Sequence, residues 1–452
     1  MKIKKVKWNN HPVLGNLELD FINATTGIAY DNILLAGENG SGKTTILETL
    51  STFLNIGSFE HFDYIEYIIG NDTYTAKQLA PQQQNTIKDF FQVNNSNGNI
   101  YPIRTNKSNN KQQIETTEYD PRRFGCVFSK ARADYKTGQI QTTTTRALDI
   151  DKYDVDKEED FTSLKQLIVD IDNQDNTEYA TRNKNLGNNP QSWDQFYPAS
   201  KIYRFKNAFD NFFDNIEYQK VENQGPEKQI IFNKSGTTVP IDKLSTGEKQ
   251  IVFRGTYLLR NITNLTDATA MIDEPELSLH PKWQKRILSY YKKLFTNGTT
   301  QNTQLFFATH SEYVLNEALI DKVNCLVIVL KESANGIETK RIDAPSVLPS
   351  ITNAETNYLA FDIVSNDYHI ELYGYLQNKE NVHAVKDCDD FILHSAHYVA
   401  ANHARASSNP HGTIYGTLST YIRNAIDHPD PTRTFTENEL RTSIELLIEL
   451  CR

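Results

Sequence analysis

The chain has 452 residues, of which 23% are charged and 38% apolar, a balance typical of a globular protein with two or three domains. Its net charge of −10 at pH 7 argues against wholesale adhesion to nucleic acid, although a local basic face could still bind it. We find no apolar run of about 18 residues, no apolar signal-peptide core and no C-x-x-C pair, and therefore expect a cytoplasmic protein with reduced thiols and no membrane association.

The first 35 residues alternate apolar and polar side chains, which predicts strands leading into the segment AGENGSGKTT at 36–45. This segment fits G-x-x-x-x-G-K-[ST], a glycine-rich loop whose N–H groups surround a phosphate. Lys43 is predicted to reach the outer phosphates of ATP, and the Thr44 hydroxyl to ligate Mg²⁺. The predicted nucleotide-binding residues of the loop are Gly37, Asn39, Gly40, Ser41, Gly42, Lys43, Thr44 and Thr45.

Residues 55–115 are rich in Asn, Gln and Thr, which predicts a surface insertion or mobile loop. Apolar spacing then predicts a buried strand at 124–128, helices near 161–171 and 202–213, and strands at 217–222 and 229–233 joined by a turn near 234–236. We expect residues from about 52 to 215 to form an insertion and helical lobe.

The segment LSTGEKQ at 244–250 precedes a predicted helix. Ser245 and Glu248 fit the S-x-x-E capping box, so one interpretation is simply a well-started helix. The alternative is an anion site, in which the Ser245 hydroxyl and the Gly247 amide face a γ-phosphate held by another protomer.

Two further buried strands end in residues suited to phosphate chemistry. The first ends at Asp273 and Glu274, where Asp273 is predicted to hold Mg²⁺ and Glu274 to orient the attacking water. The second leads to His310, which is predicted to sense the γ-phosphate. With Lys43, the residues Glu274 and His310 form the predicted catalytic set; an ordinary acidic turn and a structural histidine are the competing interpretations.

The order of GENGSGKTT, LSTGEKQ, MIDEPELSLHP and FFATHS resembles an ABC-type ATPase head of the RecF, SMC and OLD group. This resemblance implies an α/β head in which two subunits enclose two ATP molecules, the Ser245 helix of one closing over the Lys43 loop of the other. It also implies that residues 277–280 form the D-loop of that interface. An unambiguous glutamine-loop residue is missing; the nearest counterpart is 129–132, where Lys130 or Arg132 substitutes.

The last hundred residues have a mainly helical pattern and allow three uses. A Toprim-like metal site at 387–389 is disfavoured because the preceding segment is too polar for a strand. Arg423 and His428 match the R-x4-H pattern of HEPN ribonucleases. The competing interpretation is that Arg423 forms an ion pair on a helix surface and His428 ends that helix. The third use is docking, because the region resembles the C-terminal parts of anti-phage ATPases of Septu and PARIS type, which work with a separate effector nuclease.

These observations predict an ABC-type P-loop head over 1–345 and a mainly α-helical effector or partner-docking domain over 346–452. The predicted function is an ATP-hydrolysing sensor of a prokaryotic antiviral defence complex, acting as a homodimer or higher homo-oligomer that controls a partner nuclease. One alternative is a RecF-like repair ATPase in which a basic cluster lines a DNA duplex. The competing interpretation of that cluster is a solvated face of the protein. Another alternative is an ATPase with its own ribonuclease. The basic cluster comprises Arg122, Arg123, Lys130 and Arg132.

Overall fold

The computed structural model describes residues 1–79, 91–103, 111–132, 137–155, 160–297, 300–334, 336–342 and 346–452. The chain divides into two compact units. The first comprises Met1–Glu317 and Val323–Lys340, and the second comprises Ala318–Lys322 and Arg341–Arg452. None of the helices in the described ranges is long and apolar enough to span a membrane.

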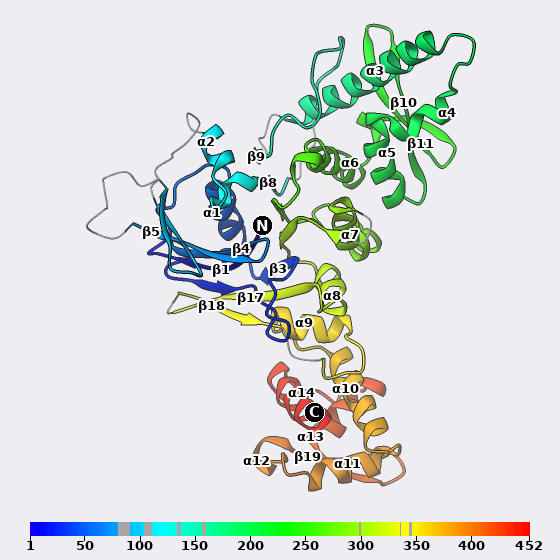
Figure 1. The fold of residues 1–452 in the computed structure, drawn as a ribbon. Coiled ribbons are helices and arrows are strands. Elements are labelled where there is room, and N and C mark those ends of the chain that lie inside the picture. The colour runs from blue at the N-terminus through cyan, green and yellow to red at the C-terminus, as the bar shows by residue number, and fades with distance from the viewer. Residues whose placement is uncertain are drawn as a thin grey trace. The chain divides into compact units, whose positions relative to one another are not determined.

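A mostly parallel sheet of seven strands, ordered β18-β17-β3-β16-β13-β8-β9, forms the centre of the first unit (Figure 1). Its inner strands are almost entirely apolar and fully buried, as expected where both faces of a parallel sheet are covered. The strands are β3 (Asn32–Gly37), β8 (Cys126–Ser129), β9 (Tyr153–Val155), β13 (Thr269–Asp273), β16 (Gln304–Ala308), β17 (Cys325–Ser333) and β18 (Gly336–Arg341). Because the inner strands are parallel, their carboxyl ends meet at one edge.

A second, antiparallel sheet has the order β2-β1-β4-β5-β6-β7. Its strands are β1 (Lys2–Trp8), β2 (Glu18–Asp20), β4 (Phe62–Ile69), β5 (Asp72–Gln78), β6 (Phe91–Asn95) and β7 (Ile100–Ile103). The prediction of a surface insertion or mobile loop across 55–115 is therefore wrong for the residues that the structure describes there. The glutamine run at 82–84 lies outside the described residues.

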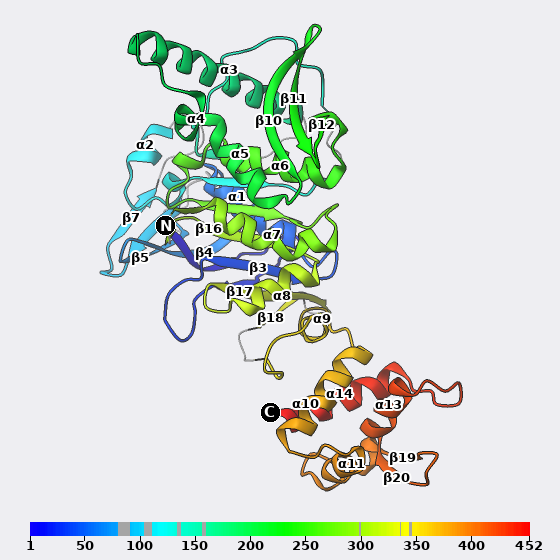
Figure 2. The ribbon, with the colours of Figure 1, turned by 90° about the vertical axis from the view of Figure 1, so that its right-hand side faces the viewer.

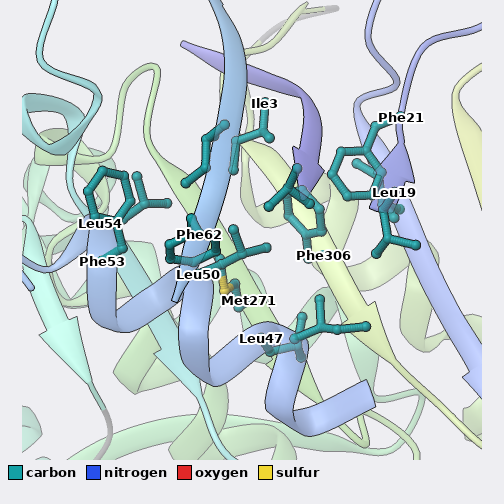
Figure 3. Packing of buried hydrophobic residues seen from close by; sticks show 14 of the residues in the cluster. Ile3, Leu19, Phe21, Leu47, Leu50, Phe53, Leu54, Phe62, Met271 and Phe306 are labelled. Atoms are coloured by element: carbon teal, nitrogen blue, oxygen red, sulfur yellow. The ribbon is translucent and has the colours of Figure 1, made fainter. Parts of the chain in front are cut away.

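Helix α1 (Lys43–Leu54) packs on strands β3, β16, β13 and β8, and its apolar face joins the side chains of both sheets in one core. Figure 3 shows Leu47, Leu50 and Phe53 of this helix among side chains of the sheets, including Phe62 and Phe306. The helix that follows the glycine-rich loop is thus anchored by buried apolar area.

A lobe of helices and a small sheet forms another part of the first unit (Figure 2). A three-stranded antiparallel sheet, β10 (Ile216–Gln224), β11 (Glu227–Lys234) and β12 (Thr237–Pro240), packs with α3 (Asp160–Leu186) and α5 (Lys201–Phe212). The expected turn near 234–236 joins β11 to β12, not β10 to β11, which are connected through Gly225 and Pro226. The other helices are α2 (Lys111–Thr116), α4 (Trp193–Phe196), α6 (Thr246–Leu259), α7 (Pro281–Leu294) and α8 (Glu312–Ile320), and the short strands β14 (Thr296–Asn297) and β15 (Thr300–Gln301) pair with each other.

The second unit is mainly helical and has its own apolar core, which includes Tyr368, Leu372, Ile422 and Leu447. Its helices are α9 (Asn353–Phe361), α10 (Asn366–Lys379), α11 (Val385–His394), α12 (Ala400–His403), α13 (Leu418–Asp427) and α14 (Glu437–Cys451). A hairpin of β19 (Ala404–Ser408) and β20 (Ile414–Thr417), absent from the predicted pattern, lies between α12 and α13. The four cysteines of the chain are buried free thiols.

Candidate functional site

The glycine-rich loop connects the end of β3 to the start of α1. Gly37 has φ of +135° and Gly42 has φ of +92°, values that favour glycine. A Cβ atom on Gly37 would lie 2.1 Å from the carbonyl oxygen of Leu330, so β17 leaves no room for a side chain there. Asn39 and Gly40 lie at the exposed tip of the loop, whereas Ser41 is buried.

Lys43 is buried inside this loop. Its ammonium group donates to the carbonyl oxygens of Gly37 at 2.9 Å and Glu38 at 2.7 Å, and to the Ser41 hydroxyl at 3.3 Å. Burial lowers the pKa of Lys43 to about 8, although the nearby carboxylates of Asp273 and other acidic residues oppose that change. The ammonium group is therefore held by two backbone carbonyl oxygens and one hydroxyl of the loop.

The Thr44 hydroxyl lies 3.1 and 3.2 Å from the two carboxylate oxygens of Asp273. Burial raises the pKa of Asp273 to about 6, with the negative charge of Glu274 acting in the same direction and the hydrogen bond from Thr44 in the opposite one. A hydroxyl and a carboxylate beside a phosphate-binding loop are the hard oxygen donors that Mg²⁺ prefers, so these two residues fit such a cation.

Glu274 follows the end of β13 in the left-handed region, with φ of +45°. Its N–H donates to the carbonyl oxygen of Ala308 at 2.8 Å, and its own carbonyl accepts from Nη1 of Arg254 at 2.9 Å. A left-handed torsion costs a non-glycine residue on the order of 1 kcal/mol, so these contacts must hold it. The backbone therefore sets the direction of this carboxylate.

His310 lies two residues beyond the end of β16, next to Glu274. Its ring Nε2 is 3.9 Å from Oε1 of Glu274, and its backbone N–H donates to Oε1 of Glu276 at 2.7 Å. Burial and the positive charge of Lys43 lower the pKa of His310, so the imidazole is neutral at physiological pH. Burial also raises the pKa of Glu276.

The structure thus brings Lys43, Thr44, Asp273, Glu274 and His310 together at the carboxyl edge of the parallel sheet. Ser245 and Gly247 lie elsewhere in the unit, at the start of α6. The capping box is present: Ser245 N–H donates to Oε2 of Glu248 at 2.8 Å, and Glu248 N–H donates to Oγ of Ser245 at 3.4 Å.

The glycine of this segment packs against the predicted D-loop of the same chain. A Cβ atom on Gly247 would lie 2.6 Å from the carbonyl oxygen of Ser278. Within the described part of the chain, neither Ser245 nor Gly247 hydrogen-bonds the glycine-rich loop.

Sequence reasoning missed two residues that support the site. Arg254 on α6 is buried and donates through Nη2 to the carbonyl oxygens of Asp273 and Lys130, both at 2.6 Å. Glu276 anchors the backbone of His310, as described above. The available signals were an arginine inside the apolar run IVFRGTYLL and a third carboxylate two residues after Glu274, beyond Pro275.

The proposed duplex-binding cluster is wrong at one position. Arg122 is completely buried and pairs with Asp120, with Nη2 2.8 Å from Oδ2, so it cannot line a duplex. The guanidinium of Arg123 stacks over the Phe124 ring at 5.4 Å, and Lys130 lies 3.4 Å from a carboxylate oxygen of Glu48.

The candidate residues of the second unit lie on helices. Arg423 forms an ion pair with Asp427 at 2.7 Å, and the exposed His428 caps the end of α13, which are the contacts of the ion-pair and helix-end interpretation. Asp389 is buried on α11 and accepts a hydrogen bond from the Thr417 hydroxyl at 2.7 Å. It therefore serves the packing of this unit.

The architecture confirms the predicted fold class, an α/β ABC-type P-loop ATPase head with additional helical elements. The chain belongs to the family described as AAA domain, putative AbiEii toxin, Type IV TA system, whose model matches residues 33–316.

Two curated relatives are probable ATPases of retrons. The retron Vc95 probable ATPase of Vibrio cholerae serotype O1 biovar El Tor is 25% identical over 152 residues, which is 32% of this chain and 28% of the relative. The retron Ec83 probable ATPase of Escherichia coli is 32% identical over 111 residues, 23% of this chain and 19% of the relative. Both matches span less than a third of the relative's length.

Among solved structures, an SMC head bound to the C-winged helix domain of ScpA is similar to this chain, with a TM-score of 0.41 and 11% sequence identity. The match covers 76% of this chain and 98% of the SMC head. The SMC head domain from Thermotoga maritima has a TM-score of 0.37 and 12% identity over 76% of this chain and all of the other.

Proposed function

We propose that this protein is the ATP-binding and ATP-hydrolysing sensor subunit of a prokaryotic antiviral defence complex. It dimerises head to head around ATP and thereby controls a partner nuclease. The family description, which refers to a toxin of a toxin–antitoxin system, and the retron association in the names of both relatives support the defence context.

The geometry of the site supports a proposed role for each of its residues. Lys43 and the loop amides bind the phosphates of ATP, and Thr44 and Asp273 hold Mg²⁺, which supplies positive charge to the phosphate oxygens when bound. Glu274 orients the attacking water and accepts its proton. His310, being neutral, donates a hydrogen bond to the γ-phosphate and orients Glu274.

One observation carries the dimer proposal. The capped start of α6 carries the exposed Ser245 and the buried Gly247, and in the described residues neither of them hydrogen-bonds the glycine-rich loop of its own chain. A helix start is a natural partner for a phosphate anion. We therefore propose that the start of α6 in one subunit completes the ATP site of another.

The Glu274→Gln variant tests this proposal. Slowed hydrolysis should trap an ATP-bound dimer or higher oligomer, which mass photometry with ATP and Mg²⁺ would detect. Lys43→Ala should stay unassembled because ATP binding is lost, and Glu338→Gln, an exposed carboxylate on β18, should behave as wild type. A Glu274→Gln protein that binds ATP but remains monomeric would contradict the sandwich.

Control of an effector is tested separately in cells. Co-expression with a nuclease encoded next to this gene should be toxic only under the triggering condition, and Lys43→Ala should remove that dependence. Toxicity of this chain alone that survives Lys43→Ala and disappears in His428→Ala would instead favour an intrinsic ribonuclease.

A further inference from the structure

A half-buried ion pair involves the first turn of α6. Nζ of Lys234 is 2.6 Å from Oε1 of Glu248, whose side chain is 6% exposed, while Oε2 of the same carboxylate accepts from Ser245 N–H. One carboxylate therefore contacts both the helix cap and a lysine of the lobe sheet.

The backbone of the lobe sheet fixes the position of this lysine. Lys234 is the last residue of β11 and pairs with Ile216 on β10 and with Thr237 on β12. A tight turn follows, with Ser235 at φ of +51°. The lysine is thus held by strands on both sides, and its side chain remains 38% exposed.

A second lysine holds the segment that precedes α6. Lys165 of α3, with 4% of its side chain exposed, lies 2.6 Å from Oδ2 of Asp242. Its ammonium group also donates to the carbonyl oxygen of Gly138 at 3.3 Å. The lobe therefore forms one ion pair with Asp242, before Ser245 in the sequence, and one with Glu248, after it.

The Lys234–Glu248 ion pair offsets the repulsion between the Glu248 carboxylate and an anion at the start of α6. A carboxylate at the third position of a helix stabilises the helix start, but it also repels any second anion that approaches the same amides. Like charges a few Å apart interact strongly in a site from which water is excluded. A cation on Glu248 cancels this repulsion while the capping hydrogen bonds remain.

We infer that Lys234 is a positioning residue for the ATP site of the other subunit: by neutralising Glu248, it lets the Ser245 helix start receive a γ-phosphate. This inference rests on the proposed function, because it requires α6 to act in trans. It gives the lobe sheet a direct role in nucleotide chemistry.

Charge rescue is the first test. Lys234→Met should lower ATP turnover about tenfold, because the γ-phosphate then meets an uncompensated carboxylate. Glu248→Gln keeps the capping hydrogen bonds and removes the charge, so the double variant should recover to within about twofold of Glu248→Gln alone. Lys228→Met, on the same strand and bonded to Asn223, is the matched control and should match wild type. A double variant as slow as Lys234→Met would overturn the inference.

Subunit mixing separates this role from a loss of stability. Lys43→Ala and Lys234→Met are each impaired, but a mixed dimer contains one site with an intact loop and an intact trans segment. Because Lys43→Ala does not assemble with itself, only the mixed dimer adds a complete site, and mixing should therefore raise turnover clearly above the sum of the two variants measured separately. Lys43→Ala mixed with Ser245→Ala is the reference. Recovery in the reference without recovery for Lys234→Met would overturn the inference, whereas failure of the reference would refute the proposed sandwich itself.

Discussion

Asp273 carries a carboxyl group in a position where burial disfavours its charge. Its pKa is raised from an ordinary value of 3.8 to about 6, so the folded protein binds the proton more tightly than the unfolded chain. Between these two pH values the folded state holds more protons, and its free energy of unfolding falls as the pH rises. Above about pH 6 the buried carboxyl group is charged, and it lowers the free energy of unfolding by the full amount.

Asp273→Asn should therefore stabilise the nucleotide-free protein while abolishing Mg²⁺-dependent hydrolysis. A raised pKa of this size corresponds to about 3 kcal/mol at pH 7.5. The gain over wild type should shrink as the pH falls from about 6 toward 3.8, because the wild-type carboxyl group becomes protonated. Chemical denaturation at pH 7.5 and pH 5 measures both values; a gain independent of pH would contradict this account.

At this scale the sequence predicted the residues that have a fixed place in a motif and missed those that act through the backbone. Lys43, Asp273, Glu274 and His310 follow directly from strand ends and the glycine-rich loop. The left-handed torsion of Glu274 depends on contacts with residues far apart in the chain, which no local pattern encodes. The failure at Arg122 has a similar cause, because its burial depends on folding against Asp120 and Phe91.

Among the elements, α6 connects the Ser245 segment with the carboxyl ends of β13 and β8. It begins at the cap that carries Ser245 and, nine residues later, presents Arg254 to the carbonyl oxygens of Asp273, Glu274 and Lys130. Lys130 lies in the segment expected to replace the glutamine loop. One helix therefore contacts the backbone at the carboxyl ends of β13 and of the neighbouring β8.

Arg254→Met should cost about 2–4 kcal/mol of unfolding free energy, because buried carbonyl oxygens lose their donor. Turnover of the folded protein should also fall, since Glu274 loses a contact that holds its torsion. Arg260→Met, at the end of the same helix, breaks a pair with Asp154 and should destabilise the protein without slowing the folded enzyme. Denaturation curves and turnover at a temperature where both variants are folded distinguish the two effects. Equal turnover in Arg254→Met and wild type would contradict this role.

The antiparallel sheet shows where composition misleads. Residues 55–115 contain enough polar residues to resemble a mobile insertion, yet Tyr67, Ala76, Phe91 and Val93 are buried on one face of β4 to β6. A strand needs an apolar residue only at alternate positions, so half of its residues can be Asn, Gln or Thr. Composition counted over a long window does not record this alternation, and it therefore does not reveal the strands.

At the scale of the whole molecule, the chain consists of two units with separate apolar cores. The core of the second unit includes Leu348 near its start and Cys451 near its end, so residues 341–452 contain the side chains needed to close it. The mainly helical character of this region was predictable from apolar spacing, but the hairpin of β19 and β20 was not, because short exposed strands carry little apolar signal.

A fragment of residues 341–452 should therefore fold alone and unfold cooperatively. Far-ultraviolet circular dichroism during heating would measure the transition. His369→Phe is an informative companion, because the wild-type ring is buried, its Nε2 lies 2.9 Å from the Ser443 hydroxyl, and burial lowers its pKa to about 3. Losing that bond should destabilise the fragment by about 1–3 kcal/mol. A fragment without a cooperative transition would contradict an independent core.

The close approach of β17 to the glycine-rich loop has a consequence for how this loop tolerates mutation. Gly37 is fixed by a neighbouring strand, because any side chain would strike the Leu330 carbonyl, whereas nothing lies within 4 Å of a Cβ atom at Gly40. A deep mutational scan of the nucleotide-free fold should accept alanine at Gly40 far more readily than at Gly37. Gly37 is therefore required by the packing of the sheet, whether or not phosphate is bound. One of the glycines that identify this motif in the sequence thus reflects the fold and not the recognition of a phosphate.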